Sequence, residues 1–147
     1  MSRARTLLVG GNDVFLDGVV DWVARDAQFE VVGRAHSGSH ALEQIEVLGA
    51  ELVLMDVTLS DRSGFEVARC IKARTDAPLV VLLSFHDSQT ARVEAWAAGA
   101  DGFVAKSELT ECLTPLLWDL LRQRDTGVGV TGSVVSITQP QPTDISN

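Results

Sequence analysis

A carboxylate, a hydroxyl and an ammonium group each follow a short apolar run of this chain. Asp56 follows Leu-Val-Leu-Met, Ser84 follows Leu-Val-Val-Leu-Leu, and Lys106 follows Gly-Phe-Val-Ala. Near-continuous apolar runs of this length are typical of strands that are buried on both faces of a parallel sheet. The carboxyl ends of such strands form the ligand-binding edge of an open α/β sheet. We therefore expect these three side chains to converge on one polar crevice.

The apolar runs alternate with stretches that have helical periodicity. The expected strands are Thr6–Val9, Phe29–Val32, Leu52–Met55, Leu79–Leu83 and Gly102–Ala105. The expected helices are Val14–Ala24, Ser39–Leu48, Phe65–Ala73, Ser88–Ala98 and a last helix that carries Leu113–Leu121. Because βαβ crossovers are right-handed, this alternation predicts an α/β fold: a doubly wound, five-stranded parallel sheet of (βα)₅ type with helices on both faces.

Local signals add detail to these elements. Ser39 is expected to be an N-cap, and Trp96 lies on the apolar side of its helix and is expected in the core. Pro115 either occupies the first position of the last helix or kinks a helix that begins earlier. Cys70 and Cys112 match no metal-site spacing and are expected to be buried free thiols with no disulfide between them.

Composition limits the classes of partner. The net charge is −8, from 12 Lys and Arg against 20 Asp and Glu, and no basic cluster is present. Direct binding to nucleic acid or to an anionic membrane is therefore not expected. No apolar run reaches the length of a membrane span or a signal-peptide core, which favours the cytoplasm.

Residues 1–125 are predicted to form one domain and residues 126–147 a flexible tail. His36, His40 and His86 are dispersed and predict no metal site.

Three segments resemble the receiver domains of two-component response regulators. They are the run 52–56 with Gly64 eight residues after its aspartate, the segment 82–87, and the segment 98–106. They occur in the order and at the spacing of that family, within a likeness that covers about Thr6–Arg122. The resemblance implies the flavodoxin-like strand order 2-1-3-4-5 and a role in phosphorelay signal transduction.

The resemblance also implies a role for each site residue. Asp56 would accept a phosphoryl group from a histidine kinase or a small phosphodonor. Ser84 would move toward that group, and Lys106 would form an ion pair with Asp56 and later with a phosphoryl oxygen. Phe103 would report the state of Ser84, and Thr58 would offer a backbone carbonyl toward a metal ion.

The chain departs from the family where the first strand ends. The family has two acidic residues there that hold Mg²⁺, whereas this chain has Gly10-Gly11. Asn12 and Asp13 follow, and both are expected to cap the first helix rather than bind metal. Ser60 and Ser107 replace prolines that are usual in the family. With one carboxylate and one lysine, the pocket has a net charge of about zero, so Mg²⁺ binding is expected to be weak or absent and phosphorylation slow.

Two functions therefore remain open. The first is a receiver that accepts a phosphoryl group on Asp56 weakly or conditionally, and the second is a phosphorylation-independent pseudo-receiver that serves as a protein-binding module. Lys106 is either a switch residue or a structural partner of Asp56. Either function would use the face formed by the fourth helix, the fifth strand with Phe103, and the fifth helix, for a protein partner or a homodimer. An enzyme is not expected, because Gly10-Gly11 has no glycine-rich phosphate motif and Asp56 lacks the second aspartate of phosphatase-type sites.

Overall fold

The computed structural model describes residues 3–85 and 88–126 of the chain. Five parallel strands form one sheet in the order β2-β1-β3-β4-β5. The strands are β1 (Ala4–Val9), β2 (Phe29–Ala35), β3 (Leu52–Asp56), β4 (Leu79–Ser84) and β5 (Gly102–Ala105). The predicted fold class, strand number and strand order are confirmed.

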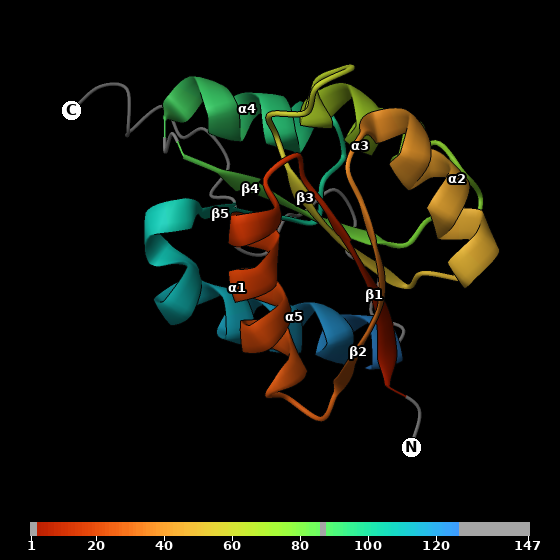
Figure 1. Ribbon diagram of the computed structural model, residues 1–147, viewed down its shortest axis with the longest axis vertical. Coiled ribbons are helices and arrows are strands. Elements are labelled where there is room, and N and C mark those ends of the chain that lie inside the picture. Colours follow the sequence, from red (N-terminus) through yellow and green to blue (C-terminus); the bar gives the residue numbers. More distant parts are fainter. Residues whose placement is uncertain (1–2, 86–87, 127–147) are drawn as a thin grey trace.

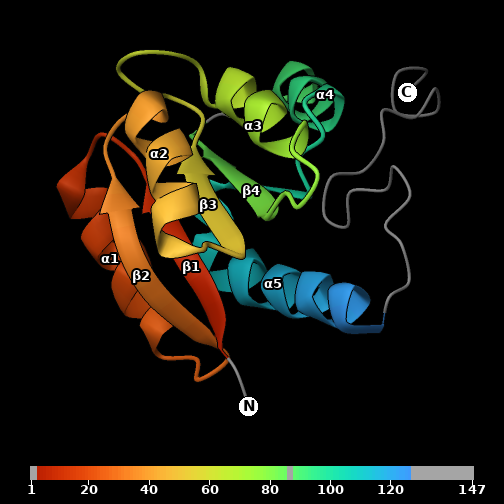
Figure 2. The same cartoon turned by 90° about the vertical axis from the view of Figure 1, so that its right-hand side faces the viewer.

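Helices cover both faces of the sheet (Figure 1, Figure 2). One face carries α1 (Asp13–Ala24) and α5 (Leu109–Thr126), and a short 3₁₀ helix, η1 (Lys106–Glu108), precedes α5. The other face carries α2 (Gly38–Leu48), α3 (Gly64–Lys72) and α4 (Gln89–Ala97). We call these the α1–α5 face and the α2–α4 face.

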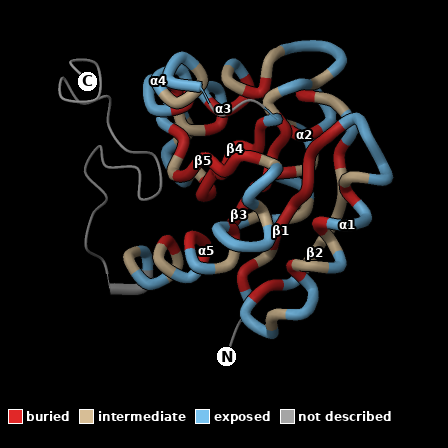
Figure 3. The backbone as a smooth tube through the Cα atoms, turned by 90° about the vertical axis from the view of Figure 1, so that its left-hand side faces the viewer, coloured by how far each residue is buried: buried red, intermediate tan, exposed pale blue. Residues whose placement is uncertain are grey.

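Each face has its own apolar core, because alternate side chains of a strand point to opposite sides of a sheet. In β1, Leu7 and Val9 belong to the core of the α2–α4 face, whereas Leu8 belongs to the core of the α1–α5 face. The central strands are buried along their length (Figure 3). Their carboxyl ends are therefore held by packing from both sides.

Polar side chains fix the beginnings of four helices. Asn12, Ser37, Ser63 and Ser88 are the N-caps of α1, α2, α3 and α4, and the side chain of each accepts a backbone N–H bond from the first turn. The expected caps Ser39 and Asp13 are wrong, because both residues already lie inside their helices. Asn12 was predicted correctly.

The inward face of α4 differs from the prediction. Ala95 is fully buried, whereas Trp96 is 38% exposed and Val93 is exposed to a similar extent. The inward position of α4 is thus taken by a small side chain, and two larger ones face outward. The expectation that Trp96 is a core residue is therefore wrong.

Helix α5 begins at Leu109, so Pro115 lies inside the helix and not at its first position. The proline has no N–H group to donate to the carbonyl of Glu111, four residues earlier. Cys112 on α5 and Cys70 on α3 are free thiols, as predicted. Both are exposed, however, so the expectation that they are buried is wrong.

In the described ranges, no helix is long and apolar enough to cross a membrane. The tail predicted for residues 126–147 lies outside the described residues, apart from Thr126, which ends α5.

Candidate functional site

The register of the sheet brings the three predicted polar residues to one edge. Asp56, the last residue of β3, is opposite Leu83 of β4. Ser84, the last residue of β4, is opposite Ala105 of β5, and Lys106 follows directly. Asp56 and Ser84 are both buried. The three residues therefore lie at the ends of three adjacent strands.

Both oxygens of the Asp56 carboxylate have a partner. The Lys106 ammonium donates to Oδ2 at 2.7 Å, and the backbone N–H of Thr58 donates to Oδ1 at 2.9 Å. The side chains of Lys106 and Asp56 are only 5% and 8% exposed. The ion pair that the resemblance implied is therefore present, and it is nearly removed from water. Removal of either member of such a pair lowers the free energy of unfolding, because the remaining charge is buried without compensation.

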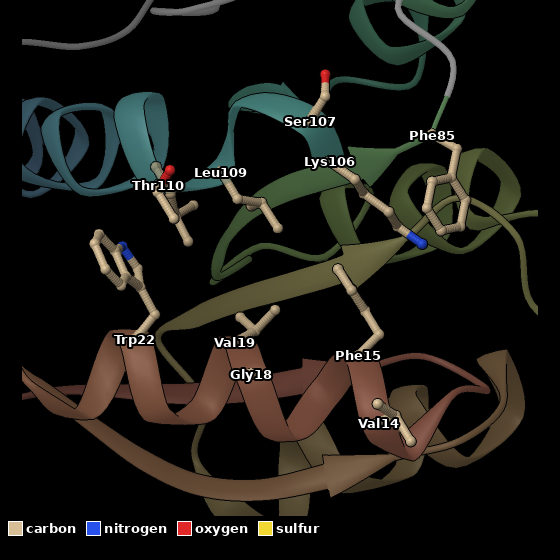
Figure 4. A pocket seen from close by; sticks show the side chains of 11 residues that line it. Val14, Phe15, Gly18, Val19, Trp22, Phe85, Lys106, Ser107, Leu109 and Thr110 are labelled. Atoms are coloured by element: carbon tan, nitrogen blue, oxygen red, sulfur yellow. The ribbon is translucent and has the colours of Figure 1, made fainter.

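Two aromatic rings complete the surroundings of the ammonium group. Its nitrogen lies 4.1 Å from the ring centroid of Phe15 in α1 and 3.8 Å from that of Phe85, directly after β4 (Figure 4). At these distances the electron-rich faces of the rings attract the cation. Lys106 is thus held by one carboxylate and two aromatic faces.

Neither phenylalanine was predicted to belong to the site. Phe15 occupies the first turns of α1 next to the buried Leu16, so its periodicity indicated only a helix. Phe85 is 73% exposed, and an exposed large apolar residue beside a polar strand end is a signal that could have found it.

Gly10 and Gly11 leave the ammonium without neighbouring carboxylates at the end of β1. A Cβ atom at Gly11 would meet nothing within 4 Å, and one at Gly10 would lie 3.2 Å from the flexible end of Leu16. Neither glycine has a positive φ. The backbone conformation therefore admits side chains at both positions, with open space at Gly11, whereas at Gly10 the buried Leu16 would have to shift by a few tenths of an ångström.

The donor set does not fit a divalent cation. Mg²⁺ needs several oxygen ligands in near-octahedral geometry, and Gly10 and Gly11 at the neighbouring strand end offer no side-chain oxygen beside Asp56. Across residues 3–85 and 88–126, no group of three or more His, Cys, Asp or Glu could hold a metal ion. Asp13 is exposed and pairs with His36 at 2.6 Å. We derive no chemical step through a metal.

The segment after Asp56 is tied to neighbouring elements. The N–H of Gly64 donates to the carbonyl of Val57 at 2.8 Å. Asp61 accepts the backbone N–H groups of Gly38 and Ser39 at the start of α2. The bond from Gly38 has the largest effect on the pKa of Asp61, and the bond from Ser39 the next largest. Together they lower this pKa from its ordinary value of 3.8 to about 2. The loop that carries Thr58 is thus anchored to α2.

Phe103 of β5 packs on the α2–α4 side of the sheet. It is 2% exposed and belongs to the core of the α2–α4 face, where the Arg92 guanidinium lies 5.4 Å from its ring centroid. It was expected to contribute to an interaction surface, and its burial shows that this expectation is wrong. The role that the resemblance implied for it beside Ser84 stays a prediction.

Asp101, which lies in the segment 98–106, has a structural role. Its Oδ2 accepts from the Lys72 ammonium at 2.7 Å and from the Val80 N–H at 2.9 Å. Lys72 also donates to the carbonyl of Pro78 at 3.0 Å. This pair joins α3 to the beginnings of β4 and β5, far from the polar edge.

The fold and this edge together define a doubly wound α/β module with a buried aspartate–lysine pair at the carboxyl ends of its strands. The sequence model described as "Response regulator receiver domain" matches residues 7–116. The chain therefore belongs to the family of response-regulator receiver domains, whose members take part in phosphorelay signalling and interact with histidine kinases and other proteins.

Similar proteins come from several bacteria. The DNA-binding transcriptional activator DevR/DosR of Mycobacterium tuberculosis is 30% identical over 102 residues, which are 69% of this chain and 47% of that protein. A protein-glutamate methylesterase/protein-glutamine glutaminase of Koribacter versatilis is 32% identical over 112 residues, 75% of this chain and 31% of that protein. The structure of the signal receiver domain of NarL from Mycobacterium tuberculosis gives a TM-score of 0.75 at 28% identity and covers 83% of this chain and 98% of that one.

The chain spans about half the length of the curated relatives that it matches first. Receiver domains are mostly signalling modules without enzymatic activity, although some homologues are methylesterases.

Proposed function

We propose that this chain is a receiver in which Asp56 accepts a phosphoryl group weakly or conditionally and which acts through contacts with other proteins. One observation carries the proposal. The Lys106 ammonium is held between Asp56, Phe15 and Phe85, beside two glycines that supply no metal ligands. In this proposal the chain has no enzymatic activity of its own.

The charge of the pocket is the reason why Asp56 should accept a phosphoryl group only weakly. A phosphoryl group in transfer carries negative charge on its equatorial oxygens, and enzymes of phosphoryl transfer neutralise that charge with cations. Here the Lys106 ammonium is already bound to the Asp56 carboxylate. An incoming phosphoryl group would have to break this bond, with no divalent cation to offset the added charge.

A phosphorylation-independent pseudo-receiver is the second candidate, and the same ion pair favours it. A ligand shifts a conformational equilibrium only by its difference in affinity for the two states. A pocket that phosphorylates poorly supplies little such bias. A resting conformation that already binds its partner then serves the function best, with Lys106 as a fixed structural element.

The partner surface in this proposal is the α4–β5–α5 face, where the outer sides of α4 and α5 flank the edge strand β5, whose own residues are buried. The exposure of Val93 and Trp96 supports it, because α4 presents two large apolar side chains to solvent. The partner is a protein or a second copy of the chain, and the net charge of −8 argues against direct contact with nucleic acid. A histidine kinase or a small phosphodonor would supply the phosphoryl group.

The test is intact-mass measurement after incubation with acetyl phosphate and Mg²⁺. We expect little phosphoprotein from the wild type, and Mg²⁺ alone should scarcely change the NMR shifts near Asp56. The double variant Gly10→Asp with Gly11→Asp should gain both Mg²⁺ binding and phosphorylation, and a further Asp56→Asn change should abolish the phosphorylation. Rapid, complete phosphorylation of the wild type would show that acceptance is neither weak nor conditional.

The two candidates differ in what Asp56→Asn does to partner binding. In the pseudo-receiver, calorimetry or pull-down should find binding nearly intact, because the resting state already binds. If Asp56→Asn alone abolishes association while circular dichroism shows an intact fold, the chain is a phospho-switch.

A further inference from the structure

A hollow lies between α1 and the beginning of α5, on the α1–α5 face (Figure 4). Its volume is about 580 Å³, within the range of sites for small organic molecules. Val14, Gly18, Val19 and Trp22 of α1 line one side, and Leu109 and Thr110 of α5 line the other. The walls are mainly apolar, so the hollow suits an apolar occupant.

Trp22, which lines the hollow, has a polar group without a partner. Its indole nitrogen is covered by protein atoms and makes no hydrogen bond within the described part of the chain. In Figure 4 this nitrogen is on the side of the ring that faces Thr110. Buried donors are almost always paired, because an unpaired one costs free energy. The donor therefore indicates an oxygen acceptor that the protein itself does not supply.

Charge narrows the class of ligand. Lys106 is the single ionisable residue among the described residues that line this hollow, and its ammonium group already binds Asp56. No carboxylate lines the hollow. A charged ligand would lose its hydration without gaining a free counter-ion, whereas a neutral one loses little. The site therefore favours an uncharged molecule.

We infer that this hollow is a binding site for an uncharged, mostly apolar small molecule whose carbonyl oxygen accepts a hydrogen bond from the Trp22 indole. Protein atoms cover the nitrogen, so binding includes a small rotation of the indole ring. The inference goes beyond the proposed function and does not depend on phosphorylation of Asp56.

The probe is benzophenone, which is neutral and apolar and has one carbonyl oxygen, and diphenylmethane is its matched control without the oxygen. The ¹⁵N-labelled full chain is titrated with each compound while the indole N–H signals of its three tryptophans are followed. With benzophenone, the Trp22 signal should move downfield and saturate, and those of Trp96 and Trp118 should stay in place. Benzophenone should bind about three- to tenfold more tightly than diphenylmethane, the value of one hydrogen bond.

Three variants locate the site. Trp22→Phe should lower the affinity for benzophenone to that for diphenylmethane. Gly18→Leu should abolish the binding of both compounds, because a side chain at Gly18 meets nothing within 4 Å and extends into the hollow. Ala24→Leu is the matched control, since it adds the same side chain at an exposed position of α1 outside the hollow. Thr110→Leu blocks the hollow from α5 if Gly18→Leu fails to fold.

Several outcomes would overturn the inference. They are no saturable binding up to the solubility limit, equal affinity for the two compounds, and binding that survives both blocking variants. Shifts confined to Trp96 or Trp118 would place the probe on the outer surface. A Trp22 shift that depends on protein concentration without any probe would show that a second copy of the chain covers this face.

Discussion

The glycines that begin α2 and α3 have crowded surroundings, whereas two glycines in and just before α1 have open ones. On the α2–α4 face, a Cβ atom at Gly64 would lie 2.6 Å from the carbonyl oxygen of Asp56, and one at Gly38 would lie 2.6 Å from Val67. On the α1–α5 face, a Cβ atom at Gly11 or Gly18 would meet nothing within 4 Å. Close packing requires the first pair, whereas open space surrounds the second.

This difference separates glycines that the packing of the fold requires from glycines that only leave the site without a side chain. Gly64 lets α3 begin directly against the end of β3, which places the loop that donates to Asp56. A side chain at Gly11 would meet no such obstacle, and the two glycines at the end of β1 leave the pocket without a carboxylate there. The crowded glycines therefore belong to the packing of the fold, whereas Gly11 belongs to the chemistry of the site.

The comparison predicts opposite effects of the same substitution on the two faces. Gly64→Ala should lower the free energy of unfolding by about 3 kcal/mol or more, because the new Cβ atom meets rigid backbone. Gly18→Ala, in the middle of α1, should raise it by about 0.5–1 kcal/mol through higher helix propensity. Urea unfolding followed by circular dichroism measures both changes. Similar values for the two variants would show that the faces do not differ in packing.

A second prediction concerns the ion pair at the boundary between the faces. Asp56→Ala leaves the buried Lys106 ammonium without its carboxylate and should cost about 3 kcal/mol. Asp56→Asn keeps the shape and an acceptor oxygen, and it should cost about 1–2 kcal/mol. Both values come from urea unfolding. Equal costs for the two variants would mean that shape and hydrogen bonding contribute nothing beyond the charge.

The third and smallest expected effect belongs to Asp61 on the α2–α4 face. Its pKa is lowered to about 2 by the N–H groups of Gly38 and Ser39. The stability that it adds is therefore fully present above its ordinary pKa of 3.8 and is lost as the pH falls through about 2. Asp61→Asn should show a slightly lower Tm than the wild type near neutral pH, and the two values should converge as the pH falls below about 2. A difference in Tm that is independent of pH would rule out the carboxylate as the cause.

Sequence reasoning predicted the elements that make up the sheet because strand ends combine two strong signals. Apolar runs of Val and Leu stop at Asp56, Ser84 and Lys106, and parallel strands bring such ends together. These inferences depend on local pattern and topology, which a single sequence contains.

The same reasoning failed where side chains from distant segments meet. Phe15 and Phe85 are 70 residues apart in the chain, and no periodicity links them to Lys106. The contact between Asp61 and α2 likewise joins two loops. Trp96 was assigned to the core from its helical face, but Ala95 takes the buried position of α4 and Trp96 is partly exposed. Packing of this kind depends on the assembled structure.

The open space at Gly11 has an evolutionary consequence. A pocket that loses its ligands and then collapses cannot regain them without rebuilding its backbone. Here the space for a carboxylate remains, and the loop after Asp56 is still anchored by Gly64 and Asp61. Substitutions at the end of β1 alone could therefore give this pocket acidic side chains, without any rebuilding of the strand ends around Asp56.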